Sequence, residues 1–200
     1  MELFWQFYLE PALGYILDSL VGLVAGAIVY VLLIPYRKQR LAHLGIIPSR
    51  HHEILLCLFM AYSGALLVLL ISPADFLNGS GINFSIPSSI TVEFVPTIFL
   101  ILTGRYTLGT WTNAMFLGNV LLFIPLGISL MLLYQKLTCK LAVGIGLILS
   151  LSIEVIQIFT GRIFDINDII YNILGTLLGT LLAHLIKKYF PSCSGKFCYE

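Results

Sequence analysis

Residues 141–159 read LAVGIGLILSLSIEVIQIF, a continuous apolar run in which Glu154 is the only charged residue. Crossing the roughly 30 Å hydrocarbon core of a membrane takes about 20 mostly apolar residues. Backbone groups inside lipid must bond within their own segment, so a run of this length predicts a membrane-spanning α-helix. A transmembrane β-strand would instead alternate apolar and polar residues over about ten positions.

Runs of similar length and polarity occur in four other places: Tyr15–Pro35, Ile54–Ser72, Asn113–Tyr134 and Ile169–Ile186. We therefore predict an all-α, polytopic membrane helix bundle with about five transmembrane helices. Residues 1–200 are expected to form a single domain. The apolar segment Val92–Leu102 is too short to cross the membrane, and it is predicted to be re-entrant or interfacial.

The composition supports lipid as the solvent of this chain. Hydrophobic residues make up 58% of it and charged residues 10%, and the mean hydropathy is +0.97. Soluble domains carry about 25% charged residues, so this chain lacks the charge to cover a water-exposed surface. These values exclude a disordered chain, and the net charge of +1 argues against a nucleic-acid partner. Residues 1–8 lack a basic segment and are not typical of a signal peptide.

The distribution of Lys and Arg predicts the orientation, because these residues accumulate in cytoplasmic loops. Nine of the 11 lie between the first and second spans, between the third and fourth, or after the fifth. The other two are Arg105 and Arg162, on the opposite side. We therefore predict that the N-terminus is outside, that the C-terminus is cytoplasmic, and that residues 188–200 form a cytoplasmic tail.

The cysteines and histidines follow the same division. All four histidines and the cysteines outside the spans fall on the predicted cytoplasmic side. We therefore predict no structural disulfide and no histidine-rich metal site on the outer face. Cys193 and Cys198 could bind a metal or be acylated, but two free thiols in a tail is the favoured interpretation.

Polar residues inside the spans are candidate functional residues, because ionisable groups at membrane depth are costly. Glu154 lies about five residues before the outer end of the fourth span, which is roughly 7–8 Å below the surface. Gln157 at i+3 and Ser150 at i−4 share its helix face. A nearby arginine would allow this carboxylate to remain charged.

The link between the fourth and fifth spans, residues 160–168, is short and rich in acids. Asp165 or Asn167 can cap the fifth span. Asp168 in its first turn suits the positive end of the helix, and it shares a face with Asn172, Gly175 and Gly179. That face begins polar and ends in small residues that would let another helix approach closely.

The third span and the outer loops complete the candidate cluster. Asn119 either bonds to a neighbouring helix or joins the cluster, and Pro125 predicts a kink. Arg105 and Arg162 either neutralise nearby acids or hold an anionic ligand through two parallel hydrogen bonds.

Two motifs in this region resemble those of a known family. Residues 118–127, GNVLLFIPLG, resemble the G-N-hydrophobic-F-x-P-x-G segment of the VanZ-like family, named for a teicoplanin-resistance protein. Residues 152–157, SIEVIQ, and 161–175, GRIFDINDIIYNILG, resemble its E-x-x-Q and G-R-x-x-D-x-x-D-x-x-x-N-x-x-G segments. The motif-bearing core covers about residues 92–184.

The chain departs from the family pattern at three positions. Glu93 stands where the family often has Asn, Thr97 stands where it has an aromatic residue, and Asn167 stands where a third Asp is common. These changes bear on the charge preference of a ligand rather than on the fold. The resemblance implies a bacterial cell-envelope membrane protein, and it implies that some members lower susceptibility to glycopeptides such as teicoplanin.

The favoured function is binding of an outer-leaflet lipid or envelope component, such as a cell-wall precursor or a lipid-linked glycopolymer. The predicted ligand-binding residues are Arg105, Asn119, Glu154, Gln157, Arg162, Asp165, Asp168 and Asn172. The alternative is a membrane-embedded enzyme that uses Glu154, Asp165 and Asp168 for acid–base or divalent-ion chemistry. A transporter is less favoured, because the inner halves of the spans hold few polar residues. The sequence specifies no cofactor.

Overall fold

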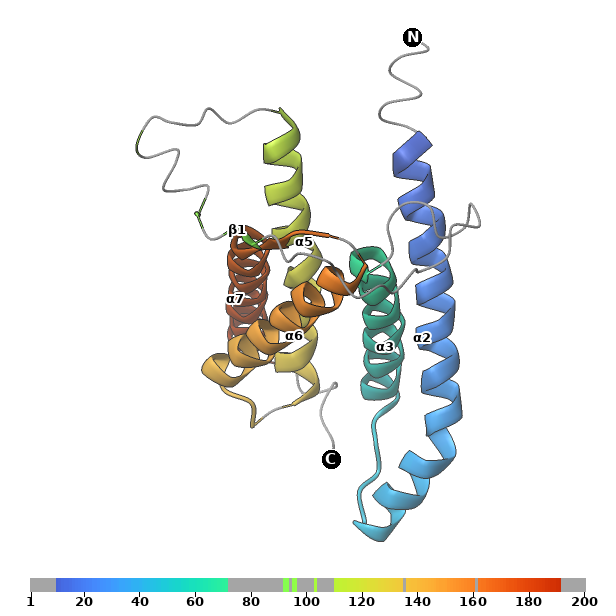
Figure 1. The fold of residues 1–200 in the computed structure, drawn as a ribbon. Helices are drawn as coiled ribbons and strands as arrows, with labels where there is room; N and C mark the ends of the chain where they lie inside the picture. Colours follow the sequence, from blue (N-terminus) through green and yellow to red (C-terminus); the bar gives the residue numbers. More distant parts are fainter. Residues whose placement is uncertain are drawn as a thin grey trace. The chain divides into compact units, whose positions relative to one another are not determined.

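The computed structural model describes residues 10–71, 92–93, 95–96, 103, 110–134, 136–160 and 162–191 of the chain. Within these residues the helices are α2 (Glu10–His43), α3 (Arg50–Ile71), α5 (Thr110–Leu133), α6 (Cys139–Phe159) and α7 (Ile166–Tyr189). Two short strands, β1 (Val92–Glu93) and β2 (Phe164–Asp165), complete the described elements (Figure 1). The chain divides into two compact units: α2 and α3 belong to one, and the remaining elements to the other.

Four helices are long and apolar enough to cross a membrane: Ile16–His43 in α2, and all of α3, α6 and α7. The fifth helix, α5, contains the shorter apolar segment Leu117–Leu133. The predicted multi-pass, all-α membrane protein is therefore confirmed. The orientation of its two ends remains a prediction.

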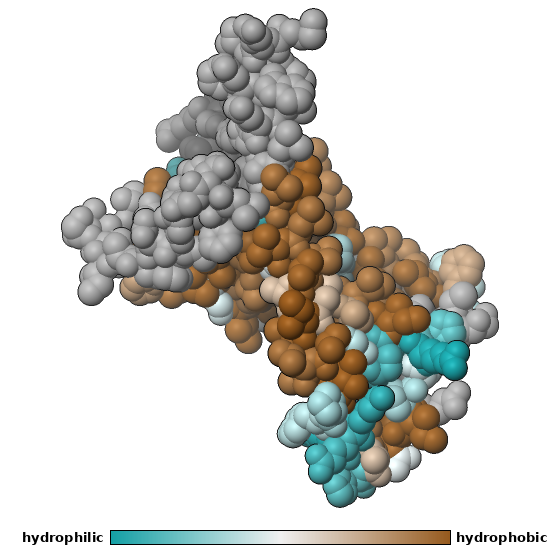
Figure 2. Space-filling model, turned by 90° about the vertical axis from the view of Figure 1, so that its right-hand side faces the viewer, coloured by the Kyte–Doolittle hydropathy of each residue, from teal (hydrophilic) through white to brown (hydrophobic). Residues whose placement is uncertain are grey.

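The surface of these helices is what a lipid environment requires. Large apolar side chains of α2 point outward, and Leu32 is 69% exposed. In Figure 2, brown apolar atoms cover most of the described face turned to the viewer, and teal hydrophilic atoms gather toward its lower end. A continuous exposed apolar surface of this kind marks contact with lipid rather than with water.

In the first unit, α2 and α3 form an antiparallel pair held at very close range. A Cβ atom on Gly22 would overlap the backbone of Gly64, and one on Gly26 would overlap the backbone of Met60. Because the partner number falls as the α2 number rises, the two helices run in opposite directions. Small residues allow this approach, which supplies packing contacts where lipid provides no hydrophobic driving force.

Helix α2 extends beyond the predicted end of the first span. The apolar run was predicted to end at Pro35, but the helix continues to His43. Proline removes only one backbone hydrogen bond and clashes with one carbonyl, so a helix with favourable residues on both sides bends there instead of ending. Figure 1 shows the last turns of α2 leaving the axis of the preceding part.

A partly buried ion pair fixes the bent end of α2 to the first turn of α3. Arg37 donates from Nη1 to Glu53 Oε2 and from Nη2 to Glu53 Oε1, both at 3.0 Å. The hydroxyl of Tyr30 donates to the same Oε2 at 2.7 Å. The pair is largely shielded, since the Arg37 and Glu53 side chains are 20% and 29% exposed. We call these three residues the α2–α3 clamp.

Replacing Glu53 by glutamine is expected to loosen this clamp. The substitution removes the charge that pairs with Arg37 and leaves one fewer acceptor for Tyr30. We expect the free energy of unfolding to fall by about 1–2 kcal/mol, because partly shielded, charge-assisted hydrogen bonds are lost. Thermal unfolding of the purified protein in detergent measures this, with Lys38→Gln as a control at an exposed cation of α2 beside Arg37. Equal midpoints for Glu53→Gln and wild type would contradict it.

In the second unit, α7 packs against both α5 and α6. The predicted small-residue face is where α5 contacts it: a Cβ atom on Gly175 would overlap the backbone of Val120, and one on Gly179 the backbone of Ile124. On the other side, Gly146 of α6 lies directly against the side chain of Thr176. Helix α7 is therefore the central element, and the residues on its two faces determine which side chains of α5 and α6 lie against it.

Strands β1 and β2 pair in parallel, with Val92 opposite Phe164 and Glu93 opposite Asp165. This pairing joins the loop before α5 to the link between α6 and α7. Most of Val92–Leu102, predicted to be re-entrant or interfacial, lies outside the described residues. Cys57 and Cys139 are free thiols. Cys193 and Cys198 also lie outside the described part.

Candidate functional site

The site is built where α6 ends and α7 begins. Thr160 closes α6 by donating its backbone N–H to the carbonyls of Gln157 and Ile158. The backbone N–H of Arg162 then donates to the Gln157 carbonyl at 3.0 Å. These bonds turn the chain within a few residues, so that polar side chains near the end of α6 face those at the start of α7.

Glu154 ties the two helices together. Its side chain is 1% exposed, and its Oε2 accepts a hydrogen bond from the backbone N–H of Asp165 at 2.9 Å. Asp165 caps α7, and its Oδ1 accepts from the backbone N–H of Asn167 at 2.8 Å and from Asn167 Nδ2 at 2.7 Å. Of the two candidate caps, the structure therefore selects Asp165, and Asn167 supports it.

Asp168 connects α7 to α5. Its Oδ1 accepts a hydrogen bond from Asn119 Nδ2 at 2.6 Å. Asn119 is therefore the bridge between helices that the sequence suggested, and its partner is a carboxylate of the candidate cluster. Both predicted roles of Asn119, interhelical bonding and membership of the cluster, apply to the same contact.

Asn172 lies one turn deeper, and its side chain is 2% exposed. Its Nδ2 donates to Ser150 Oγ at 2.9 Å, and its backbone carbonyl accepts from Thr176 Oγ1 at 2.9 Å. Its side-chain Oδ1 is buried and has no donor among the residues that the structure describes. A buried acceptor without a donor costs about 1–3 kcal/mol, so this oxygen is suited to receive a donor from a bound molecule.

The ionisable side chains of the cluster are mainly acidic. The carboxylates of Glu154, Asp165 and Asp168 interact electrostatically with one another. Arg162 is exposed and lies within electrostatic range of both Glu154 and Asp168. The described cluster thus combines several hydrogen-bond acceptors with a single guanidinium at its edge.

The structure brings together seven of the eight predicted site residues. Gln157 is 2% exposed on the face of α6 that carries Glu154 and Ser150. Arg105, the eighth, lies outside the described residues. No group of three or more His, Cys, Asp or Glu side chains within the described ranges is arranged to hold a metal ion.

Sequence reasoning missed the contribution of the β1–β2 pair. Glu93 lies in register with Asp165, so the acid of the upstream motif is held beside the cap of α7. Two-residue strands leave no periodic signal in a sequence, and the two segments are far apart along the chain. Ser150 was expected to extend the face of Glu154, but its pairing with Asn172 required knowledge of how α6 and α7 face each other.

The comparison with protein families agrees with this arrangement. The VanZ/LLP1 family profile matches residues 54–187, which is well over half of the chain. The chain belongs to the VanZ/LLP1 family. The match covers most of α3, the whole of α5 and α6, and α7 as far as Lys187, so it includes every described residue of the candidate site. Neither a curated protein nor a solved structure matches the chain.

Proposed function

We propose that this VanZ/LLP1 protein binds the headgroup of an outer-leaflet lipid or a lipid-linked envelope component through the cluster at the α6–α7 junction. The observation that carries the proposal is the buried Asn172 Oδ1, which has no described donor and lies on the same side of α6 as the buried Glu154. Polar groups at this depth are costly, and binding a ligand is the usual reason that they are retained.

The charges of the cluster indicate the chemistry of the ligand. Glu154, Asp168 and Asn172 Oδ1 are acceptors, and they suit hydroxyl or ammonium donors. The Arg162 guanidinium suits a phosphate or a carboxylate, which it can hold through two parallel bonds. The ligand that fits is therefore an amphipathic molecule whose headgroup carries both an anionic group and hydroxyl or amino groups.

A cell-wall precursor or a lipid-linked glycopolymer has this combination, and its acyl or prenyl chain would lie along the apolar surface of the helices. Binding such a molecule on the outer face would change how much of it is accessible to glycopeptide antibiotics. We therefore propose that the protein lowers susceptibility to teicoplanin, which is the phenotype that its family resemblance implies.

The experiment measures the lipids that remain bound after purification. Wild-type protein extracted from bacterial membranes in mild detergent is analysed by mass spectrometry for retained lipids, beside the variant Asn172→Ala. Ser152→Ala is the control, because Ser152 is an exposed residue of α6 that bonds to its own helix at the Ile148 carbonyl.

We expect Asn172→Ala to separate binding from stability. The loss of the bond to Ser150 is offset by removal of an unpaired buried oxygen, so the free energy of unfolding should change by less than about 1 kcal/mol. Retention of the specific lipid should fall at least about tenfold, while Ser152→Ala keeps it. Wild-type retention of Asn172→Ala, or loss of folded protein with no loss of binding per folded molecule, would contradict the proposal.

An enzymatic role is the second candidate. The observation that favours it is that Glu154 and Asp168 are close enough to interact electrostatically. Two neighbouring carboxylates can divide the roles of acid and base. Incubation of the purified protein with labelled lipid extract distinguishes the two functions. A modified lipid that depends on Glu154 would identify an enzyme, and an unmodified retained lipid would identify a binding protein.

A further inference from the structure

The bent end of α2 carries a second polar surface, in the other compact unit. Residues 36–52 contain Arg37, Lys38, Arg40 and Arg50 and no acidic residue. The nearest acid in sequence, Glu53, is already bound to Arg37 and Tyr30 in the α2–α3 clamp. Lys38, Arg40 and Arg50 therefore have no other acidic residue near them in the sequence.

The position of this segment relative to lipid follows from helix length. The apolar part of α2, from Ile16 to Ile34, is about 28 Å long at 1.5 Å per residue, close to the hydrocarbon thickness of about 30 Å. Tyr36 and the residues after it therefore lie at the level of the lipid headgroups. The bend at Pro35 turns them away from the axis of the preceding part of α2 (Figure 1).

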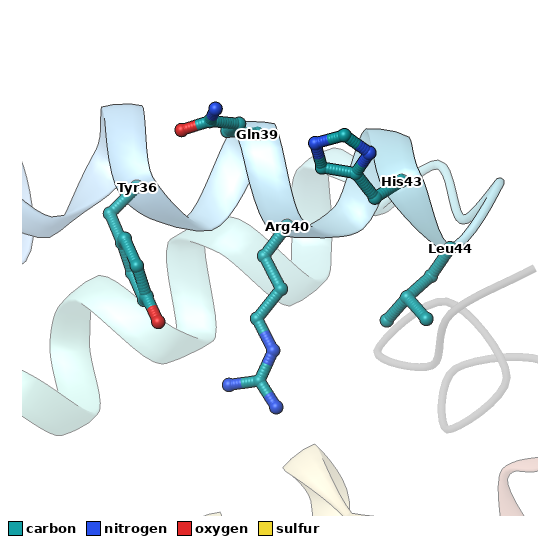
Figure 3. A pocket seen from close by; sticks show the side chains of 5 residues that line it. All are labelled: Tyr36, Gln39, Arg40, His43 and Leu44. Atoms are coloured by element: carbon teal, nitrogen blue, oxygen red, sulfur yellow. The ribbon is translucent and has the colours of Figure 1, made fainter.

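Side chains on one side of this segment surround an open hollow of about 370 Å³, lined by Tyr36, Gln39, Arg40, His43 and Leu44. Figure 3 shows that Tyr36, Arg40 and Leu44, which follow one another at intervals of four residues, extend toward the same side, with Leu44 in the turn directly after α2. The Arg40 guanidinium lies between the aromatic ring and the leucine. Tyr36 and Leu44 are 63% and 62% exposed.

This combination has the chemistry of an anionic lipid headgroup site. A guanidinium holds a phosphodiester through parallel hydrogen bonds. Tyrosine rings settle at the boundary between acyl chains and headgroups, and exposed leucine contacts the upper acyl chain. We propose that Tyr36, Arg40 and Leu44 form a binding site for an anionic phospholipid in the leaflet at this end of α2.

The α2–α3 clamp gives the site its geometry. By fixing Arg37 to Glu53, it sets the rotation of the bent segment about its own axis. Arg37 is thereby held at α3, whereas Arg40, three residues later, has no part in the clamp and lines the hollow. Lys38, which is also exposed, adds charge but does not line the hollow.

The test measures binding of a fluorescent phosphatidylglycerol to the full-length protein in neutral detergent. Phosphatidylcholine serves as the uncharged comparison, and inorganic phosphate serves as a competitor. We expect phosphatidylglycerol to bind more tightly than phosphatidylcholine, and Arg40→Gln to weaken its binding about fivefold, the effect of one cation near an anionic surface. Arg40→Lys should retain most of the affinity.

The control is Lys140→Gln, which removes one exposed cation at the start of α6. It should leave phosphatidylglycerol binding unchanged. Three results would overturn the proposal: equal binding of the two lipids, equal loss of affinity in Arg40→Gln and Lys140→Gln, or displacement of the lipid by millimolar phosphate. The last result would identify the hollow as a site for a free anion instead of a lipid.

Discussion

Gly179→Ala is expected to lower the thermal unfolding midpoint of the purified protein by about 3–10 °C, the equivalent of about 1–3 kcal/mol. The methyl group would overlap the backbone carbonyl of Ile124, and a backbone cannot move aside as the end of a side chain can. Helices α5 and α7 would have to separate, and Gly175 and Gly127, which maintain the same close approach, would lose their contacts.

A second Gly→Ala substitution shows whether a lower unfolding midpoint in Gly179→Ala has a steric cause. Alanine favours helix over glycine by about 1 kcal/mol, so a substitution with no steric cost should stabilise a helix. Gly144→Ala on α6 is such a case, because an added Cβ atom meets nothing within 4 Å. We expect Gly144→Ala to raise the midpoint or leave it unchanged. A rise in Gly179→Ala as well would mean that α5 and α7 are not packed as closely as the structure shows.

Separation of α5 and α7 would also affect the candidate site. The bond of 2.6 Å between Asn119 and Asp168 joins the same two helices about two turns from Gly175 and about three turns from Gly179. Lipid retention by Gly179→Ala should therefore fall together with its stability. In a variant of the site itself, by contrast, lipid retention should fall while stability is preserved.

Glu154→Gln is expected to reduce retention of the specific lipid by at least about tenfold, while folding is preserved. Glutamine keeps an oxygen that can accept from the backbone N–H of Asp165, so the link from α6 to the cap of α7 remains. It loses the negative charge that we propose attracts a hydroxyl or ammonium group. In cells, the variant should lose any teicoplanin resistance at a normal protein level.

The comparison with Glu154→Ala isolates the structural part of this residue's role. Alanine removes the acceptor as well as the charge, and it leaves the Asp165 N–H without its partner at a cost of about 1–3 kcal/mol. Glu53→Gln is the control for loss of a carboxylate elsewhere: it should lower stability but leave lipid retention per folded molecule unchanged, since Glu53 belongs to the α2–α3 clamp and not to the site. If Glu154→Gln retained lipid as wild type does, Glu154 would be a folding element and the proposed site would be wrong.

Much of the candidate site followed from the sequence, because helix geometry fixes which residues share a face. Ser150, Glu154 and Gln157 are separated by three or four positions, and all three are buried on one side of α6. Asn172, Gly175 and Gly179 are likewise buried on α7. The sequence does not specify which face of α6 lies against which face of α7. It therefore could not predict the Asn172–Ser150 bond or the choice of Asp165 as the cap.

Sequence alone established the solvent and the elements of this protein. Apolar runs of about 20 residues with almost no charge cannot be stable in water, and inside lipid they can only be helices, whatever surrounds them. The packing partners were decided by tertiary structure, because close approach depends on which glycines meet which backbones. Tertiary structure also decided the bend at Pro35, the α2–α3 clamp and the β1–β2 pair. The clamp and the strand pair depend on contacts between residues distant in the chain, and the bend depends on how the neighbouring turns of α2 are supported. The pattern of polarity along a sequence contains neither kind of information.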